Sequence, residues 1–202
     1  MSERTDELSD FETRAVRAGT ERSQFNEHSE ALFLTSSFVF DNAAQAAARF
    51  SGAEAGNVYS RFTNPTVTMF EQRLASLEGA EDCLATASGM AAIMATCLAA
   101  LRAGDHVVCA ANVFGATIQL FSNVLSRFGI AVTYVDATDM HAWRAAVTAN
   151  TRLLYCETPS NPLMELVDLT QFGNFGRAIG ALSVVDNCFC TPALQRPFDF
   201  GV

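Results

Sequence analysis

The stretch at residues 152–162 reads Arg152-Leu153-Leu154-Tyr155-Cys156, followed by Glu157-Thr158-Pro159-Ser160-Asn161-Pro162. Its first half is a short apolar run, the pattern of a strand that is buried on both faces of a sheet. Its second half is polar and contains two prolines, so we expect the strand to end in a rigid loop. Comparable apolar runs predict further strands at 82–87, 106–110, 130–135 and 182–186.

Segments with helical spacing alternate with these strands. Apolar residues three or four apart, good N-caps and terminal glycines predict a short helix ending at Phe50 and longer ones over 64–77, 89–102, 115–127, 140–148 and 169–179. This alternation is typical of an α/β fold with a mostly parallel sheet covered by helices. In such sheets ligands bind beyond the carboxyl ends of the strands, so the loops that follow the strands carry the functional information.

Composition and charge exclude several functional classes. The chain has 202 residues, 50% of them hydrophobic, and a net charge of −9. An acidic chain with scattered basic residues lacks the electrostatic footprint of a nucleic-acid-binding protein. The longest apolar stretch, 83–101, contains Ser88, Gly89 and Thr96, which favours a strand, a turn and a helix over a membrane span. A dinucleotide-binding site is excluded because no G-x-G-x-x-G follows a strand.

The six cysteines predict no disulfide framework. Most lie in apolar runs, which is typical of small buried hydrophobic residues in a reducing compartment. The polar start, Met1 to Arg4, has no apolar signal-peptide segment, so we expect a cytoplasmic protein. Cys188 and Cys190 form a C-x-C pair without a second pair nearby, and therefore do not predict a metal site.

Two predicted strands lead into candidate phosphate-binding and ring-binding residues. Ser88, Gly89 and Met90 open a long helix whose first N–H groups can bind a phosphate, although an ordinary serine cap has the same pattern. Phe114 follows the strand at 106–110 and can stack on a planar ring, although it can equally be a core phenylalanine.

Two further strands end in polar residues. Asn161 offers both a donor and an acceptor in the proline-bounded loop, while the Asn-Pro pair also suits a simple turn. Asp186 ends an apolar strand where a buried carboxylate needs a partner, and a pyridinium N–H would serve; capping of the next turn is the alternative.

An arginine and a tyrosine precede these strands. Tyr59 and Arg61 are two residues apart on a segment that we expect to be extended, so their side chains project the same way. A phenol and a guanidinium together make a good phosphate clamp, although alone they read as a surface pair.

Taken together, these segments resemble one family. The order of phosphate-binding turn, ring-stacking aromatic, asparagine and aspartate resembles fold-type I pyridoxal-phosphate (PLP) enzymes. The local strings are similar to those of the Cys/Met-metabolism (transsulfuration) enzymes over nearly the whole chain. The strings are Tyr59-Ser60-Arg61, Asn64-Pro65-Thr66, Ala87-Ser88-Gly89-Met90-Ala91, Glu157-Thr158-Pro159-Ser160-Asn161-Pro162, Val185-Asp186-Asn187, Thr191-Pro192 and Leu194-Gln195-Arg196-Pro197.

The resemblance implies a role for each candidate residue. The N–H groups of Gly89 and Met90, after Ser88, would hold the PLP phosphate, and Phe114 would stack on the pyridine ring. Asn161 would bond the ring oxygen O3′, and Asp186 would pair with the ring nitrogen. Tyr59 and Arg61 would reach the phosphate in a neighbouring subunit, which implies a homodimer or homotetramer with shared active sites.

The resemblance also implies a reaction. Residues 112–115 and 187–194 are most similar to the branch that makes homocysteine from an O-acylhomoserine, such as O-succinylhomoserine, and sulfide by γ-replacement. Many relatives, the C–S lyases above all, carry tyrosine where Phe114 stands, which weighs against a lyase. The alternatives within the family are a cystathionine γ-synthase, with cysteine as acceptor, and a related C–S lyase.

All 13 basic residues are arginine, and the sequence contains no lysine. Only a lysine amine forms the Schiff base that the family uses, so we predict no catalytic residue in this chain and no activity of the chain alone. The resemblance implies an N-terminal arm at 1–56 and a partial PLP-binding large domain at 57–202. It also implies that the rest of that domain and a C-terminal domain lie outside this sequence, so we expect an incomplete fold. The alternative from another class is a non-catalytic fragment or a module that binds another phosphate ligand.

Overall fold

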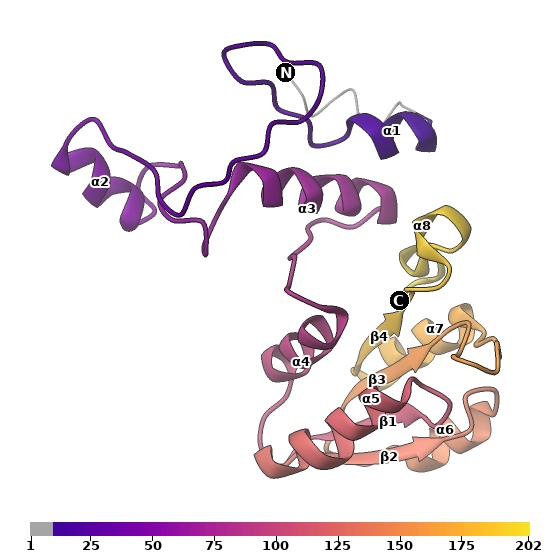
Figure 1. The fold of residues 1–202 in the computed structure, drawn as a ribbon. Coiled ribbons are helices and arrows are strands. Elements are labelled where there is room, and N and C mark those ends of the chain that lie inside the picture. The colour runs from indigo at the N-terminus through magenta and orange to yellow at the C-terminus, as the bar shows by residue number, and fades with distance from the viewer. Residues whose placement is uncertain (1–9) are drawn as a thin grey trace. The chain divides into compact units, whose positions relative to one another are not determined.

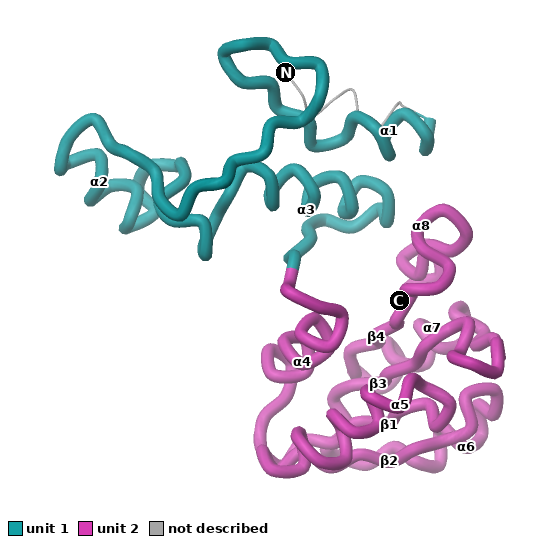
Figure 2. The backbone as a smooth tube through the Cα atoms, in the orientation of Figure 1, with its two compact units in different colours: residues 1–85 teal, residues 86–202 magenta. Residues whose placement is uncertain are grey.

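The computed structural model describes residues 10–202, which form two compact units that separate between Ala85 and Thr86 (Figure 2). The boundary at 56/57 given above divides the chain by expected role, and it stays a prediction. No helix within the described residues is long and apolar enough to cross a bilayer.

The first unit contains the helices α1 (Phe11–Arg17), α2 (Ala43–Phe50) and α3 (Pro65–Glu78) (Figure 1). The two predicted helices, α2 and α3, are confirmed, and each begins after an asparagine that caps it. The Asn42 side chain accepts from Gln45 N at 2.9 Å, and the Asn64 side chain accepts from Thr66 N at 2.9 Å. The loop at 31–40 has little regular structure, apart from one isolated antiparallel bridge between Ser37 and Tyr59.

The second unit confirms the predicted α/β fold (Figure 1). Its four strands are β1 (His106–Ala110), β2 (Ala131–Val135), β3 (Thr151–Glu157) and β4 (Leu182–Asp186). All neighbouring strands are parallel, in the order β2-β1-β3-β4. The helices are α4 (Gly89–Ala100), α5 (Gly115–Gln119), α6 (Met140–Ala146), α7 (Leu169–Ile179) and α8 (Thr191–Leu194). The predicted helix at 115–127 changes pitch, because a π-helical turn at 120–124 and a 3-10 turn at 125–128 follow α5.

The core lies around the two central strands. Every residue of β1 is buried, as are six of the seven residues of β3, whereas the outer strands β2 and β4 are partly exposed. Trp143 of α6 is fully buried and meets Phe172 of α7 edge-on, with 5.2 Å between ring centroids. Because the strands are parallel, their carboxyl ends and the loops that follow them lie along one edge of the sheet.

The strand predicted at 82–87 is wrong. The segment has no regular structure, and Leu84 within it is 79% exposed. An apolar run forms a strand only where a neighbouring strand completes its backbone hydrogen bonds, and no described strand pairs with this one. One of its amides is satisfied differently, because Ala85 N donates to the Glu71 carboxylate at 2.7 Å.

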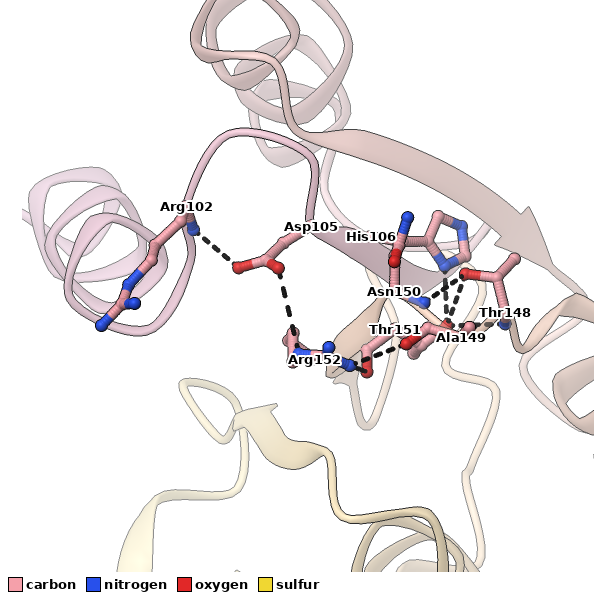
Figure 3. A network of polar contacts seen from close by, with 8 residues as sticks. All are labelled: Arg102, Asp105, His106, Thr148, Ala149, Asn150, Thr151 and Arg152. Carbon is pink, nitrogen blue, oxygen red and sulfur yellow. Dashed lines mark hydrogen bonds and ion pairs between the residues drawn. The ribbon is translucent and has the colours of Figure 1, made fainter.

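A polar network closes the opposite, amino-terminal edge of the sheet (Figure 3). The buried His106 ring lies between two hydroxyls, with Nδ1 at 2.8 Å from Thr151 Oγ1 and Nε2 at 2.9 Å from Thr133 Oγ1. Burial lowers the pKa of His106, which favours the neutral ring. This histidine therefore links the starts of β1 and β3 to β2, and it lies away from the carboxyl edge.

Candidate functional site at the carboxyl edge of the sheet

Phe114 lies where β1 gives way to α5. The residue is 48% exposed, so it is not the core phenylalanine of the alternative interpretation. Its N–H donates to Glu157 Oε2 at 2.8 Å, and its carbonyl accepts from Thr117 N at 2.9 Å. The backbone at Phe114 is thus fixed on both sides, while about half of the residue's surface remains accessible.

Asn161 follows β3 in the proline-bounded loop, in which both prolines follow cis peptide bonds. Its N–H donates to the other carboxylate oxygen of Glu157, Oε1, at 2.9 Å. The rest of the loop is held by the Thr158 hydroxyl, which accepts from Val167 N at 3.0 Å. The side-chain amide of Asn161 makes no hydrogen bond within residues 10–202, so both its donor and its acceptor are available.

Asp186 is the last residue of β4 and is paired in register with Glu157 on β3. One oxygen accepts from Cys188 N at 3.0 Å, and the other lies 3.5 Å from the Tyr155 hydroxyl, which is a long contact. The turn-capping alternative is therefore correct as far as Oδ1 is concerned. Oδ2 retains most of its capacity to accept.

Two acidic side chains lie next to each other at the ends of β3 and β4. Asp186 and Glu157 are adjacent, and no basic side chain in the described part of the chain pairs with either of them. Burial raises the pKa of Glu157, and the Asp186 carboxylate raises it further, although two backbone N–H groups act in the opposite direction. A cationic N–H group from a ligand would relieve this repulsion.

The amino terminus of α4 presents free backbone donors. Ser88 caps the helix through its hydroxyl, which accepts from Ala91 N at 3.2 Å, so the serine-cap reading is correct. The N–H groups of Gly89 and Met90 find no acceptor among the described residues. Apart from its chain neighbours and the backbone of its own helix, no atom of the described residues lies within 4 Å of the position that a Cβ on Gly89 would take, so an anion can approach the backbone there.

Tyr59 and Arg61 belong to the first unit. Tyr59 forms the bridge to Ser37, but the chain turns directly after it, where Phe62 N donates to Tyr59 O at 2.9 Å, so the expectation that the segment stays extended as far as Arg61 is wrong. The two side chains are nevertheless neighbours, because the Arg61 guanidinium lies 5.4 Å from the centroid of the Tyr59 ring. Both residues are exposed, and Arg61 forms no ion pair with any other described residue.

The cysteines are all free thiols, as expected of a chain without a disulfide framework. Three are buried: Cys97, Cys109 and Cys156. Burial raises the pKa of Cys97 to about 11, and it also raises the pKa values of Cys109 and Cys156, so these thiols are inert. The prediction of buried cysteines is thus confirmed for these three and wrong for Cys188, which is exposed in the loop after β4, while Cys83 and Cys190 are partly exposed.

The residues fit a phosphorylated pyridine. Free helix N–H groups suit a phosphate, and a half-exposed aromatic ring suits a planar heterocycle. The unbonded amide of Asn161 and the under-satisfied carboxylate of Asp186 suit a ring oxygen and a ring N–H. Sequence reasoning missed Glu157, whose signal was the same as that of Asp186, a carboxylate at the end of an apolar strand.

A parallel α/β sheet with these residues in the loops after its strands is typical of proteins that hold a phosphate-bearing cofactor. The sequence profile of the Cys/Met metabolism PLP-dependent enzymes matches residues 12–202, and the chain belongs to this family. Its members use pyridoxal phosphate, so the cofactor expectation is confirmed.

Individual relatives narrow the comparison. The chain is 56% identical over 191 residues to an O-succinylhomoserine sulfhydrylase of Pseudomonas aeruginosa, and 41% identical over 190 residues to an L-methionine gamma-lyase of Fusobacterium nucleatum subsp. polymorphum. These alignments cover 95% and 94% of this chain, but only 47% and 48% of the relatives. The chain thus spans about half the length of the curated relatives it matches.

The fold of this chain is also similar to that of a solved structure. A candidate O-acetylhomoserine (thiol)-lyase from Campylobacter jejuni subsp. jejuni superposes with a TM-score of 0.91 at 32% identity, over 96% of this chain and 48% of that one. That crystal structure contains N'-pyridoxyl-lysine-5'-monophosphate.

Proposed function

We propose that this chain holds pyridoxal 5'-phosphate at the carboxyl edge of its sheet, within an enzyme that makes homocysteine from O-succinylhomoserine and sulfide. The observation that carries the proposal is the convergence of three loops there. Both oxygens of Glu157 bond to the amides of Phe114 and Asn161, and Glu157 is paired in register with Asp186.

Each candidate site residue of this chain then has a defined role in binding the cofactor. Gly89 and Met90, behind the Ser88 cap, bind the phosphate through their N–H groups. The Phe114 ring covers one face of the pyridine, and the Asn161 amide bonds the ring oxygen O3′. Tyr59 and Arg61 bind the phosphate held by a second copy of the chain, which makes the enzyme a homodimer or homotetramer.

Bound pyridoxal phosphate supplies an electron sink for chemistry at the carbon atoms of an amino acid. Asp186 supports this chemistry by holding a proton on the ring nitrogen, where its negative charge favours the protonated form. The Phe114 side chain shields one side of the ring from water. This sequence contains no lysine, so the chain itself supplies no amine to react with the cofactor's aldehyde.

The identity of the reaction is supported by relatives and by one side chain. The P. aeruginosa relative, at 56% identity, is named a sulfhydrylase. Phe114 has no hydroxyl, and so cannot assist the proton transfers assigned to tyrosine at this place in C–S lyases. The similarity to an L-methionine gamma-lyase, at 41% identity, keeps γ-elimination as the second candidate.

A fusion enzyme tests the reaction. This chain is joined to the remaining half of the P. aeruginosa relative, loaded with pyridoxal phosphate and given O-succinylhomoserine with sulfide or with cysteine, or methionine alone. We expect homocysteine with sulfide as the fastest product. Release of methanethiol from methionine at a higher rate would favour the lyase, and cystathionine as the main product would favour the γ-synthase. The intact P. aeruginosa enzyme is the control.

A further inference from the structure

Glu157 is an acidic residue for which the proposed chemistry has no use. It ends β3, is 7% exposed, and places both carboxylate oxygens on backbone amides. Oε2 accepts from Phe114 N at 2.8 Å, and Oε1 accepts from Asn161 N at 2.9 Å. The carboxylate is therefore fully used in two charge-assisted hydrogen bonds, which are about twice as strong as neutral ones.

The two amides belong to loops that follow different strands. Phe114 comes after β1 and precedes α5, whereas Asn161 comes after β3. A single carboxylate, with a fixed spacing between its oxygens, therefore sets the separation of the two loop backbones. No other described side chain accepts from either amide.

This link is made in an unfavourable place for a charge. Glu157 is buried beside Asp186, and no cation pairs with it among residues 10–202. A second link between the same loops is made at the surface, where Asn112 Nδ2 donates to Glu165 Oε2 at 2.7 Å. The exposed link already joins the two loops. The buried carboxylate differs from it because it bonds directly to the amides of Phe114 and Asn161.

We propose that Glu157 is a positioning residue that holds Phe114 and Asn161 at the spacing required for one pyridine ring to contact both. The inference rests on the proposed cofactor site. Glu157 itself touches neither the cofactor nor the substrate, and acts through the two backbone amides.

A pair of matched substitutions tests the inference in the chain itself. Glu157→Gln removes one of two acceptor oxygens and turns an NH₂ group toward a backbone N–H. Glu165→Gln is the control, because only one oxygen of Glu165 accepts a hydrogen bond and glutamine retains one. The probes are pyridoxamine 5'-phosphate, which needs no lysine, and inorganic phosphate, which reports on the α4 terminus alone.

For Glu157→Gln we expect the affinity for pyridoxamine phosphate to fall about tenfold, or about 1.4 kcal/mol. The affinity for inorganic phosphate should be unchanged, and amide hydrogen exchange should become faster at Phe114 and Asn161. Glu165→Gln should change none of these. Equal losses for both probes, or faster exchange without any loss of affinity, would mean a purely structural role and overturn the inference.

The wild-type chain separates this inference from the proposed function. If it binds pyridoxamine phosphate no more tightly than inorganic phosphate, the cofactor site and the inference both fail. If it prefers pyridoxamine phosphate and Glu157→Gln retains that preference, the inference alone fails.

A second measurement covers the case in which Glu157→Gln does not fold. In the wild-type chain, the amide proton shifts of Phe114 and Asn161 should change together as acid protonates Glu157. The titratable groups facing Glu157 are Asp186 on β4, Tyr155 and Cys156 on β3, and Cys109 on β1. The phenol and thiols stay neutral in acid, and Asp186→Asn removes the remaining carboxylate. Amide shifts that move independently, or not at all, would overturn the inference.

Discussion

Replacing Asp186 with asparagine separates the binding of the cofactor ring from the stability of the fold. The amide oxygen of an asparagine can still accept from Cys188 N, which lies 3.0 Å from Asp186 Oδ1, so the turn after β4 should be retained. The substitution also removes one of two adjacent carboxylates, because Asp186 is paired in register with Glu157. We therefore expect the midpoint of urea unfolding to stay the same or to rise.

The expected loss falls on the ring nitrogen. The negative charge of Asp186 would be exchanged for a neutral amide, and a charge-assisted hydrogen bond contributes about 1.5–3 kcal/mol. This corresponds to a drop of about 10- to 150-fold in the affinity for pyridoxamine 5'-phosphate. Fluorescence titration of the chain measures it, and inorganic phosphate should bind as before.

The matched control is Asp136→Asn. Asp136 directly follows β2 at the same edge of the sheet, and its Oδ1 accepts from Thr138 N at 2.8 Å, a bond that asparagine retains. We expect its affinity for pyridoxamine phosphate to equal that of the wild type. An Asp186→Asn chain that binds as tightly as the wild type would refute the assignment of Asp186 to the ring nitrogen.

Three further outcomes are expected. In the fusion enzyme, Phe114→Tyr should raise methanethiol release from methionine relative to homocysteine formation, and an unchanged product ratio would refute the proposed role of the missing hydroxyl. The pKa of His106 is lowered from 6.5, so the stability that the neutral ring contributes is present above pH 6.5 and is lost as the pH falls through the lowered pKa. Urea midpoints followed by Trp143 fluorescence should therefore decrease as the pH falls over this range. His106→Gln should reduce this pH dependence. Borohydride treatment of the isolated chain with pyridoxal phosphate should leave no pyridoxyl adduct on a lysine side chain, because none is present, and mass spectrometry would detect one.

The sheet was predictable because its central strands are buried on both faces. Val107 and Leu153 lie in continuous apolar runs, which few other structures accommodate. The segment around Leu84 carries a similar run but has no neighbouring strand in the described part of the chain. Local sequence does not show which apolar segments will pair with a neighbouring strand. For this reason the prediction of a strand at 82–87 was wrong.

The candidate site was predictable where the role of a residue follows from its immediate neighbours in the sequence. Asp186 and Asn161 stand out because a polar residue follows a buried strand. Glu157 does so too, but its role depends on an amide 43 residues away in the sequence. Only the fold brings Phe114 N to its carboxylate, so no local pattern could have shown the link.

Amide chemical shifts of the isotope-labelled chain, followed during titration with pyridoxamine 5'-phosphate, report residue by residue whether a pyridine ring binds at the carboxyl edge of the sheet. We expect the largest saturable shifts to occur together, with one dissociation constant, at Gly89, Met90, Phe114, Asn161 and Cys188. Shifts confined to Gly89 and Met90 would indicate a simple phosphate site. An absence of saturable shifts at Phe114, Asn161 and Cys188 would contradict a ring held at the carboxyl edge of the sheet.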